Sequence, residues 1–396
     1  MNDYDLSKPL TLAQCQAMDL AALAEGRVGR GPDGSPFFLG YDDVVQLLVH
    51  PHASPGGAAV VERQGISDGP IHEWFRDFFA LSDPPQHTHL RSLVARTFAV
   101  RPIERMRAVA RKEAEEALDS LQPGRAFDVF DEFATRVPMR VICSVLGTED
   151  LDLDALWKSI CDLGRALVAL SLSPEERVNG DRAIEELYAA IEPVVAKKRA
   201  QPGEDLISHL VRAEDAGQMT HGQLLAMVSG LMFAGIDTTR TLIALAFSLL
   251  AEHPDQRALL QRQPELAASA VEEIFRVAPP APWIVRFAAQ RMEHAGVVLE
   301  PGDAIMLVLS AANLDQVGIA EVERFDIARK PTLHLGLGRG RHFCLGAALA
   351  RLEGQEMLQA LAARGLRLEL VGDVPRWSRA DQLIRPSEPL RLRVHA

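Results

Sequence analysis

The feature that most constrains this chain is an apolar run from Leu224 to Leu250, interrupted near its centre by the residues 237–240, Asp-Thr-Thr-Arg. Such a run is long enough to cross a membrane as a helix. However, an Asp or an Arg at the centre of a bilayer costs roughly 2.5–3.5 kcal/mol on insertion scales, more than several leucines return. We therefore predict a long central helix of a soluble protein over 224–252, in which the polar groups have a function.

Apolar residues recur with the helical period along most of the chain, and clusters of Pro and Gly separate the helical stretches. Besides the central helix, we predict helices over 13–25, 41–48, 86–98, 103–121, 130–146, 151–170, 174–199, 206–213, 264–276 and 346–362. No Ser/Gly-rich linker, low-complexity tract or internal repeat divides the chain. We therefore predict a single domain over residues 1–396.

Strand patterns are fewer and lie late in the chain. The segments 366–370 and 390–394 alternate apolar with charged residues, as half-buried strands do. Two further strands, 297–299 and 304–309, flank Glu300-Pro301-Gly302-Asp303, a sequence typical of a turn, so we predict a hairpin there. The predicted fold class is mainly α with a small β portion.

Composition excludes several classes of function. The 42 Lys and Arg against 54 Asp and Glu give a net charge of −12, which argues against general nucleic-acid binding. The first ten residues are polar and charged, so we expect neither a signal peptide nor a membrane anchor, and hence a cytoplasmic protein. Cys15, Cys143, Cys161 and Cys344 stand far apart without a CxxC pair, so neither a disulfide framework nor a cysteine zinc site is expected.

The most informative stretch is the loop 335–346, Leu-Gly-Leu-Gly-Arg-Gly-Arg-His-Phe-Cys-Leu-Gly. Its glycines allow backbone conformations closed to other residues and close approach to a flat ligand. Cys344 lies just before an apolar helical pattern, where free N–H groups and the helix dipole favour a thiolate. A single anionic sulfur in such a loop suits a haem iron. On this loop alone, a buried free cysteine beside a turn is the alternative.

Four motifs in order along the chain carry a resemblance to a known family. Residues 338–346, Gly-x-Gly-x-His-x-Cys-x-Gly, resemble the haem-binding signature of bacterial cytochromes P-450, which are haem-thiolate monooxygenases. Residues 234–239, Ala-Gly-Ile-Asp-Thr-Thr, resemble the oxygen-binding groove of the family's central helix. Residues 83–91 resemble the family's DPPEHTRLR helix start, and 273–276, Glu-Ile-Phe-Arg, its ExxR element. The resemblance implies the cytochrome P-450 fold, with haem between the long central helix and the cysteine loop.

The resemblance also assigns the chemistry. It makes Cys344 the metal ligand, holding the iron of haem b (iron protoporphyrin IX) through a thiolate that favours O–O cleavage. It makes Asp237 and Thr238 catalytic: Thr238 would hydrogen-bond dioxygen or an ordered water, and Asp237 would relay protons from outside. The resemblance also implies further cofactor-binding residues, and its histidines and arginines would pair with the haem propionates. These residues are His87, Arg91, Ala234, Arg286, Gly338, His342 and Gly346.

Further residues are assigned to support and to the substrate. Glu273 and Arg276, with Arg324 as the third member, would have a structural role, holding the segment that leads to the cysteine loop. The residues expected to face the substrate are Phe233, Ala234, Pro282, Trp283 and Ile284. The aromatic cluster Trp74, Phe75, Phe78 and Phe79 either covers the substrate or belongs to the core.

One position departs from the family's pattern within the cysteine motif. Leu337 stands where the family usually has a Phe, whose ring normally lies near the thiolate. We expect this change to alter the shielding of the sulfur and the redox potential without preventing ligation.

The function that the resemblance implies is insertion of one oxygen atom from O2 into a small, mostly apolar organic substrate. The chain has no flavin or nicotinamide fingerprint, so electrons would come from NAD(P)H through a reductase and a ferredoxin. The alternatives use the same haem site for oxidative coupling, desaturation or peroxide-driven oxidation, or make the protein a non-catalytic haem-binding sensor. Neither nucleic acid nor a membrane is an expected partner.

A run of basic residues is the expected dock for the electron donor. Its alternative is an ordinary solvated helical face. The run consists of Arg91, Arg96, Arg101, Arg105, Arg107, Arg111 and Lys112, with Arg339 and Arg341 added from the cysteine loop.

Overall fold

The computed structural model describes residues 5–31, 34–169, 171–316 and 318–395. The chain divides into two compact units. Unit 1 comprises residues 1–54, 110–137 and 238–396, and unit 2 comprises 55–109 and 138–237. Each unit is therefore assembled from segments that are separated in the sequence, and the chain passes from one unit to the other four times.

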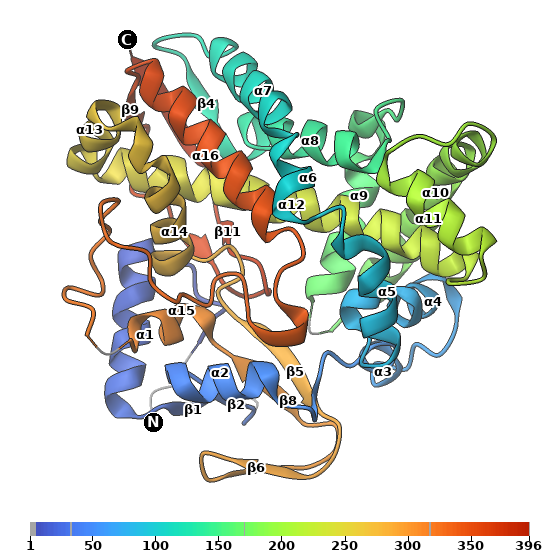
Figure 1. Ribbon diagram of the computed structural model, residues 1–396. Coiled ribbons are helices and arrows are strands. Elements are labelled where there is room, and N and C mark those ends of the chain that lie inside the picture. Colours follow the sequence, from blue (N-terminus) through green and yellow to red (C-terminus); the bar gives the residue numbers. More distant parts are fainter. Residues whose placement is uncertain (1–4, 32–33, 170, 317, 396) are drawn as a thin grey trace. The chain divides into compact units, whose positions relative to one another are not determined.

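The β portion lies mainly in unit 1, where the larger sheet has five strands in the order β1-β2-β8-β5-β3. These strands are β1 (Val28–Arg30), β2 (Pro36–Phe38), β3 (Ala53–Ser54), β5 (Ile284–Ala288) and β8 (Ala304–Leu307). Figure 1 shows β5 and β8 side by side; they are antiparallel, whereas β2 and β8 are parallel. The larger sheet thereby joins the beginning of the chain to residues near 300.

Three smaller sheets complete the β portion. One has the order β4-β12-β9, and the other two are the pairs β6–β7 and β10–β11. Their strands are β4 (Ala126–Asp128), β9 (Arg367–Leu370), β12 (Arg391–His395), β6 (Met292–His294), β7 (Val297–Leu299), β10 (Trp377–Ser378) and β11 (Arg385–Pro386). The predicted strands near 366–370 and 390–394 pair with each other as β9 and β12.

Unit 1 also holds the helices that surround the cysteine loop. They are α1 (Leu12–Glu25), α2 (Tyr41–Val49), α13 (Pro254–Arg262), α14 (Ala267–Val277), α15 (Leu309–Leu314), α16 (Ala347–Ala363) and most of α7 (Arg107–Asp119). Helices α14 and α16 pack against each other, and the cysteine loop leads directly into α16. This pair therefore sets where the cysteine lies.

Unit 2 is helical. Its elements are α3 (Ala59–Glu62), α4 (Gly69–Asp77), α5 (Gln86–Ala95), α6 (Val100–Glu104), α9 (Leu153–Val168), α10 (Pro174–Ala200), α11 (Leu206–Asp215) and most of α8 (Arg136–Leu146). Helix α10 begins where its sequence predicts, because Ser173 and Glu176 form a capping box around the first turn and Pro174 fits the first helical position. It then packs along α9 and α4.

A layer of aromatic rings resting on glycines organises the interior of unit 2. A Cβ added at Gly164 would lie 2.1 Å from the Phe233 ring, and one added at Gly230 would lie 2.4 Å from the Phe78 ring. Beside them, the Trp74 indole N–H donates to the Ser229 hydroxyl at 3.0 Å. We call these residues the glycine–aromatic layer. Its close approaches depend on the missing side chains of the two glycines.

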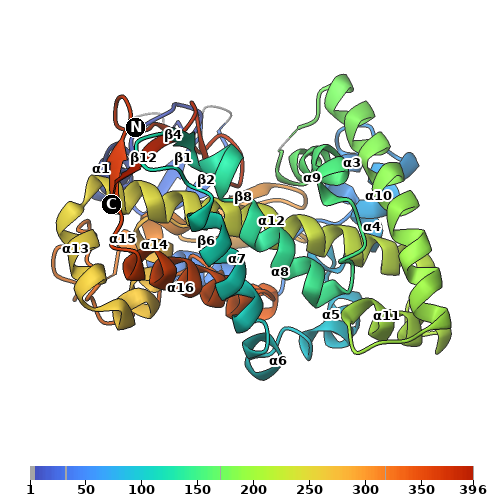
Figure 2. The same ribbon diagram turned by 90° about the horizontal axis from the view of Figure 1, so that it is seen from above.

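The predicted central helix is present as α12 (His221–Glu252), a single helix of 32 residues, which is labelled in Figure 2. By length and composition it could cross a membrane, yet 83% of its most apolar window is buried inside the protein. Burial of this kind is what the core helix of a folded protein shows. Residues up to Asp237 belong to unit 2, and those from Thr238 onward belong to unit 1.

Two predictions about secondary structure are wrong. Strands 297–299 and 304–309 do not form a hairpin: β7 pairs with β6, and β8 pairs with β5 and β2. The turn itself forms, with the Asp303 N–H bonded to the Glu300 carbonyl, but Gly302 and Asp303 then bond to Ala288 of β5. The helix predicted over 103–121 is also broken, into α6 and α7.

Other helix boundaries shift by a few residues. The helix predicted over 86–98 ends at Ala95 as α5, and the one over 130–146 begins with a π turn, Val129–Phe133, before α8. Leu170, at the end of the helix predicted over 151–170, lies outside the described residues, as do residues 1–4 of the polar N-terminal stretch.

Candidate active site

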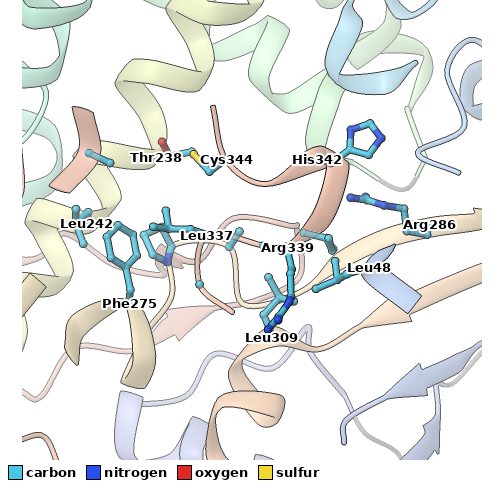
Figure 3. Close-up of a pocket in the computed structure, with 16 residues that line it drawn as sticks. Leu48, Thr238, Leu242, Phe275, Arg286, Leu309, Leu337, Arg339, His342 and Cys344 are labelled. Atoms are coloured by element: carbon cyan, nitrogen blue, oxygen red, sulfur yellow. The ribbon is translucent and has the colours of Figure 1, made fainter. Parts of the chain in front are cut away.

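A pocket in unit 1 brings the cysteine loop together with the second half of α12. The cavity has a volume of about 230 Å³. Cys344 and Thr238 both line it. Figure 3 shows these two side chains together with the residues that line the rest of the pocket.

The pocket has chemically different ends. Leu242 and Phe275 lie on one side of the view in Figure 3, and Arg286 and His342 lie on the opposite side. Arg339 also lines the pocket, which brings the cationic or potentially cationic side chains there to three. A haem has an apolar ring and two propionates that need charged partners if they are buried. The residues present therefore fit a haem, with Cys344 as its candidate sulfur ligand.

Glycines give the cysteine loop its course. Gly338 has φ +69°, a conformation that L side chains rarely adopt. A Cβ at Gly336 would lie 2.5 Å from the Phe275 carbonyl oxygen, so the loop can run this close to α14 only without a side chain there. The Cys344 N–H donates to the Leu337 carbonyl at 3.0 Å, closing the loop three residues before α16 begins.

The four cysteines form no disulfide among the described residues. All four cysteines lie among the described residues and carry free thiols; Cys15 and Cys143 are buried, and Cys161 and Cys344 are partly exposed. Within the described part of the chain, no group of three or more His, Cys, Asp or Glu side chains is placed to hold a metal ion. A metal bound through a single cysteine would therefore need its other ligands from a cofactor.

One stripe of α12 is less deeply buried than the rest of the helix. Every residue between Leu224 and Leu250, a fully described stretch, is buried except Ala234, Gly235 and Thr238. Their spacing of i, i+1 and i+4 places them on one face of the helix. Asp237 is only 3% exposed. Thr238 lines the pocket, whereas Gly235 lies against the Ile142 side chain, which a Cβ at residue 235 would approach to 2.8 Å.

A set of buried polar contacts supports the cysteine loop. The Glu273 carboxylate accepts hydrogen bonds from the Arg276 guanidinium at 2.7 and 2.8 Å, from Arg329 Nε at 3.1 Å and from the Asp326 backbone N–H at 3.0 Å. The side chains of Glu273 and Arg276 are 3% and 0% exposed. A buried charge pair is stable only when its remaining hydrogen bonds are also made, as they are here.

The third member of this cluster is Arg329, and the prediction of Arg324 is wrong. The Arg324 guanidinium is 56% exposed and pairs with Glu321 at 2.8 Å. Only its backbone takes part, because the Arg324 carbonyl accepts from Arg276 at 3.0 Å. The two arginines lie five residues apart in a stretch without helical or strand periodicity, so the sequence gives no sign of which one turns inward.

Asn313 is a supporting residue that the sequence analysis missed. It is fully buried on α15; its amide donates to the Phe275 and Arg276 carbonyls at 3.3 and 3.0 Å, and its oxygen accepts from the Leu335 N–H at 2.7 Å. It thus ties the end of α14 to the start of the cysteine loop. We call Glu273, Arg276, Arg329 and Asn313 the loop support.

Comparison with known proteins decides the family. The family model described as Cytochrome P-450 matches residues 37–392. The chain belongs to the cytochrome P-450 family. Its relatives include 6-deoxyerythronolide B hydroxylase of Saccharopolyspora erythraea, 35% identical over 82% of this chain and 80% of the relative. Vitamin D(3) 25-hydroxylase of Pseudonocardia autotrophica is 36% identical over 84% of this chain and 81% of the relative.

A solved structure agrees with this assignment. The crystal structure of CalO2 superposes with a TM-score of 0.92 at 28% identity, covering 99% of both chains. The predicted mainly helical P-450 fold is therefore confirmed, and the protein is an oxidoreductase of a family that binds haem b through a cysteine thiolate. The resemblance seen in the four sequence motifs is confirmed with it.

The residues predicted to bind the cofactor from unit 2 lie on α5 of this P-450. His87 and Arg91 are four residues apart and so share one helical face. His87 is 2% exposed, and its ring stacks on Phe79 with centroids 6.1 Å apart. In unit 1, Arg286 lies on β5, where its guanidinium also donates to the Val285 carbonyl at 2.8 Å. Gly346 forms the N-cap of α16.

The predicted substrate residues of the P-450 divide into two groups. Ile284 lines the pocket of unit 1, but Pro282 and Trp283 do not; Pro280 and Ala281 line it instead. Trp283 is 1% exposed, packs in the core, and donates its indole N–H to the Arg379 carbonyl at 2.8 Å. The prediction for Trp283 is therefore wrong, because its ring points into the core.

The aromatic residues of unit 2 are packed in its interior. Phe233 is 3% exposed and covers Gly164. Trp74, Phe75, Phe78 and Phe79 are each no more than 3% exposed and form a chain of ring contacts. Of the two interpretations offered for this cluster, these contacts favour the core.

Several residues of the basic run already have acidic partners. Arg107 pairs with Glu104, Arg111 with Glu356 at 2.8 Å, and Lys112 with Glu116 at 3.8 Å. Arg341 donates to the His50 carbonyl at 2.7 Å. The three ion pairs with glutamates reduce the net positive charge of the run.

Proposed function

We propose that this P-450 inserts one oxygen atom from O2 into a small, mostly apolar organic substrate. The observation that carries the proposal is the pocket that Cys344 and Thr238 line together, with Arg286, Arg339 and His342 around it. The relatives named as hydroxylases support hydroxylation as the reaction. Ile284, a predicted substrate residue that lines this pocket, supports an apolar substrate.

The chain's own residues hold the cofactor and move protons. Haem b, when bound to a thiolate, supplies the redox chemistry that activates O2. Cys344 is the proposed ligand, and its loop is fixed by glycines and by the loop support. Arg286 and His342, together with His87 and Arg91, are proposed to bind the propionates, since charged hydrogen bonds to carboxylates are the strong ones.

The less deeply buried stripe of α12, with Thr238 and its neighbour Asp237, is the proposed site of proton delivery. Thr238 lines the pocket, and its hydroxyl can both donate and accept a hydrogen bond. Asp237, buried and next to Thr238, is the proposed source of protons. General acid catalysis by a positioned group contributes typically about 10²–10⁴-fold to a rate.

Electrons are proposed to come from NAD(P)H through a reductase and a ferredoxin, in the cytoplasm. The basic residues near Arg91 and Arg96, with Arg339 and Arg341 of the cysteine loop, are the proposed docking charges. Rim charges of this kind mainly raise the rate of encounter with an acidic partner.

The absorption spectrum of the dithionite-reduced protein with carbon monoxide tests the proposed ligand. We expect a strongly red-shifted Soret band in the wild type and its loss in Cys344→Ala, because only a thiolate ligand produces the shift. Cys161→Ala, which removes another partly exposed thiol, should leave the band unchanged. An unshifted band in well-folded wild type would contradict the proposal.

Replacement of Thr238 tests proton delivery. In Thr238→Ala, product formed per NAD(P)H consumed should fall on the order of tenfold, with hydrogen peroxide released instead, since a positioned hydroxyl is lost. Thr238→Ser keeps the hydroxyl and should retain most of the coupling. Equal coupling in wild type and Thr238→Ala would remove Thr238 from the relay, and a wild type without substrate-dependent NAD(P)H consumption would indicate a sensor.

A further inference from the structure

A second carboxylate on α14, next to Glu273, makes a separate set of contacts. Glu272 accepts hydrogen bonds from Arg351 Nε at 2.6 Å and Nη2 at 2.9 Å, and from His334 Nε2 at 3.0 Å. His334 lies ten residues before Cys344 and Arg351 seven residues after it. One carboxylate thus holds both the segment that enters the cysteine loop and the helix that leaves it.

The hydrogen bonds of His334 define its tautomer. The Gly336 N–H donates to Nδ1 at 3.2 Å, so Nδ1 accepts and the ring proton lies on Nε2, where it is donated to Glu272. The His334 side chain is 3% exposed, and its ring stacks on Phe275 with centroids 5.7 Å apart. The ring therefore connects the Glu272 carboxylate directly to the backbone of the cysteine loop.

Charge extends this connection to the sulfur. Burial raises the pKa of Glu272, but the hydrogen bonds from His334 and Arg351 outweigh it and lower that pKa to about 2. Glu272 is therefore ionised at any physiological pH. The Arg351 guanidinium interacts electrostatically with Cys344 as well as with Glu272. The sulfur thus experiences a positive charge that Glu272 partly neutralises.

We propose that Glu272, His334 and Arg351 position the Cys344 sulfur and set its electrostatic environment, and so tune the redox potential of the haem. The inference rests on the proposed role of Cys344 as the iron ligand. It is separate from the loop support, because Glu272 shares no hydrogen-bond partner with Glu273 among the contacts described. All three act through Cys344 and are positioning residues.

The proposal has a directional consequence. A positive charge near the sulfur favours the reduced, more negative state of the haem, and a negative charge disfavours it. Glu272→Gln removes a negative charge and should raise the reduction potential. Arg351→Gln removes a positive charge and should lower it. A role limited to folding would not give shifts of opposite sign.

Spectroelectrochemical titration of the haem-loaded protein, with wild type and both variants, is the experiment. We expect each single substitution to change the reduction equilibrium on the order of tenfold, which corresponds to about 59 mV for one electron. The double variant Glu272→Gln/Arg351→Gln should return close to the wild-type potential, since the two charge changes cancel. The matched control is Arg364→Gln, which removes an arginine at the end of α16 and breaks its ion pair with Asp119. This variant should keep the wild-type reduction potential.

A second measurement separates charge from position. Hydrogen exchange of the Gly336 backbone N–H should be faster in the double variant than in wild type, although the two reduction potentials agree. The reason is that His334, which accepts from this N–H, is held less firmly when its partner Glu272 is replaced. Arg351→Lys keeps the charge and loses the bidentate contact, so it should keep the potential and accelerate the same exchange.

Three results would overturn the inference. The first is a shift of both single variants in the same direction, and the second is no shift in either while the wild type shows the thiolate band with carbon monoxide. In both cases the proposed ligand would stand. A wild type without that band would overturn the proposed ligand and this inference together.

Discussion

The loop support of unit 1 and the glycine–aromatic layer of unit 2 hold their surroundings by different physics. In the loop support, buried charges and amides meet in fixed directions, as Glu273 does with Arg276 and Arg329. In the glycine–aromatic layer, rings such as Phe233 and Phe78 rest on glycine backbone without any charge. The first depends on the identity of each group, and the second depends on volume.

This difference teaches which changes each region can accept. Removing one partner of a buried charge pair leaves the other uncompensated, so the loop support should respond sharply to single substitutions. A packed apolar layer can lose one contact and regain it through a compensating change in volume. The region that positions the cysteine therefore tolerates less variation than the region built from rings.

The largest effect should follow from breaking the loop support at Glu273. Glu273→Gln leaves the fully buried Arg276 guanidinium without its counter-charge, and the free energy of unfolding should fall by about 3–5 kcal/mol. Haem content after purification should fall as well. Urea unfolding and the ratio of haem to protein absorbance measure the two effects.

The control for this variant is an exposed ion pair in the irregular segment that also supplies Arg329. Glu321→Gln removes the partner of Arg324, whose side chain is 56% exposed, and should cost less than about 1 kcal/mol. Equal losses in the two variants would show that burial does not distinguish the clusters.

A pH-dependent effect should come from Glu353, a carboxyl on α16 that is fully buried. Burial raises its pKa to about 8, and the Thr239 hydroxyl offsets only part of that rise. Between about pH 4.5 and about pH 8, the folded state binds a proton that the unfolded state releases. The free energy of unfolding should therefore fall with rising pH, by about 1.4 kcal/mol per pH unit.

Glu353→Gln should abolish this part of the pH dependence, and unfolding midpoints measured at several pH values check it. Glu272 provides the opposite case. Because its pKa is lowered to about 2, its contribution to stability is complete above the unfolded value of 4.5 and is lost as the pH falls toward 2. Identical pH profiles for wild type and Glu353→Gln would contradict the burial argument.

The smallest effect should appear in the glycine–aromatic layer. Gly164→Ala places a methyl group 2.1 Å from the Phe233 ring, and the free energy of unfolding should fall by about 1–3 kcal/mol. Haem content should stay unchanged. Adding Phe233→Leu should recover part of the loss, and a double-mutant cycle measures the coupling. A loss of haem comparable to that in Glu273→Gln would remove the distinction between the regions.

The sequence predicted the elements whose signals are local. The central helix, the helix beginning at Pro174 and the strands near residues 367 and 391 follow from periodicity. The hairpin predicted around Glu300–Asp303 does not form, because β8 pairs with β5 and β2. The turn sequence itself gives no sign of pairing with β2, which is distant in the sequence. Local signals therefore give elements more reliably than their pairing.

The site shows the same limit. The motif residues Cys344 and Thr238 line one pocket, as their family pattern led us to expect. Arg329, not the predicted Arg324, contacts Glu273, and Trp283 points into the core instead of the pocket. The sequence could not show this, because the direction of a side chain in an irregular segment depends on tertiary contacts. Asn313, His334 and Arg351 gave no signal of their own, since a single polar residue in an apolar stretch has many possible partners.

The discontinuous units also order events during synthesis. Every residue of unit 2 precedes Thr238, whereas unit 1 still lacks its last 159 residues when unit 2 has been translated. At about 5–20 residues per second, the ribosome needs roughly 8–30 seconds for that remainder. Unit 2 therefore has all its residues while unit 1 is incomplete, and Cys344 is among the last residues to emerge. The proposed loading of the cofactor through this thiol is therefore expected only after unit 2 has been translated.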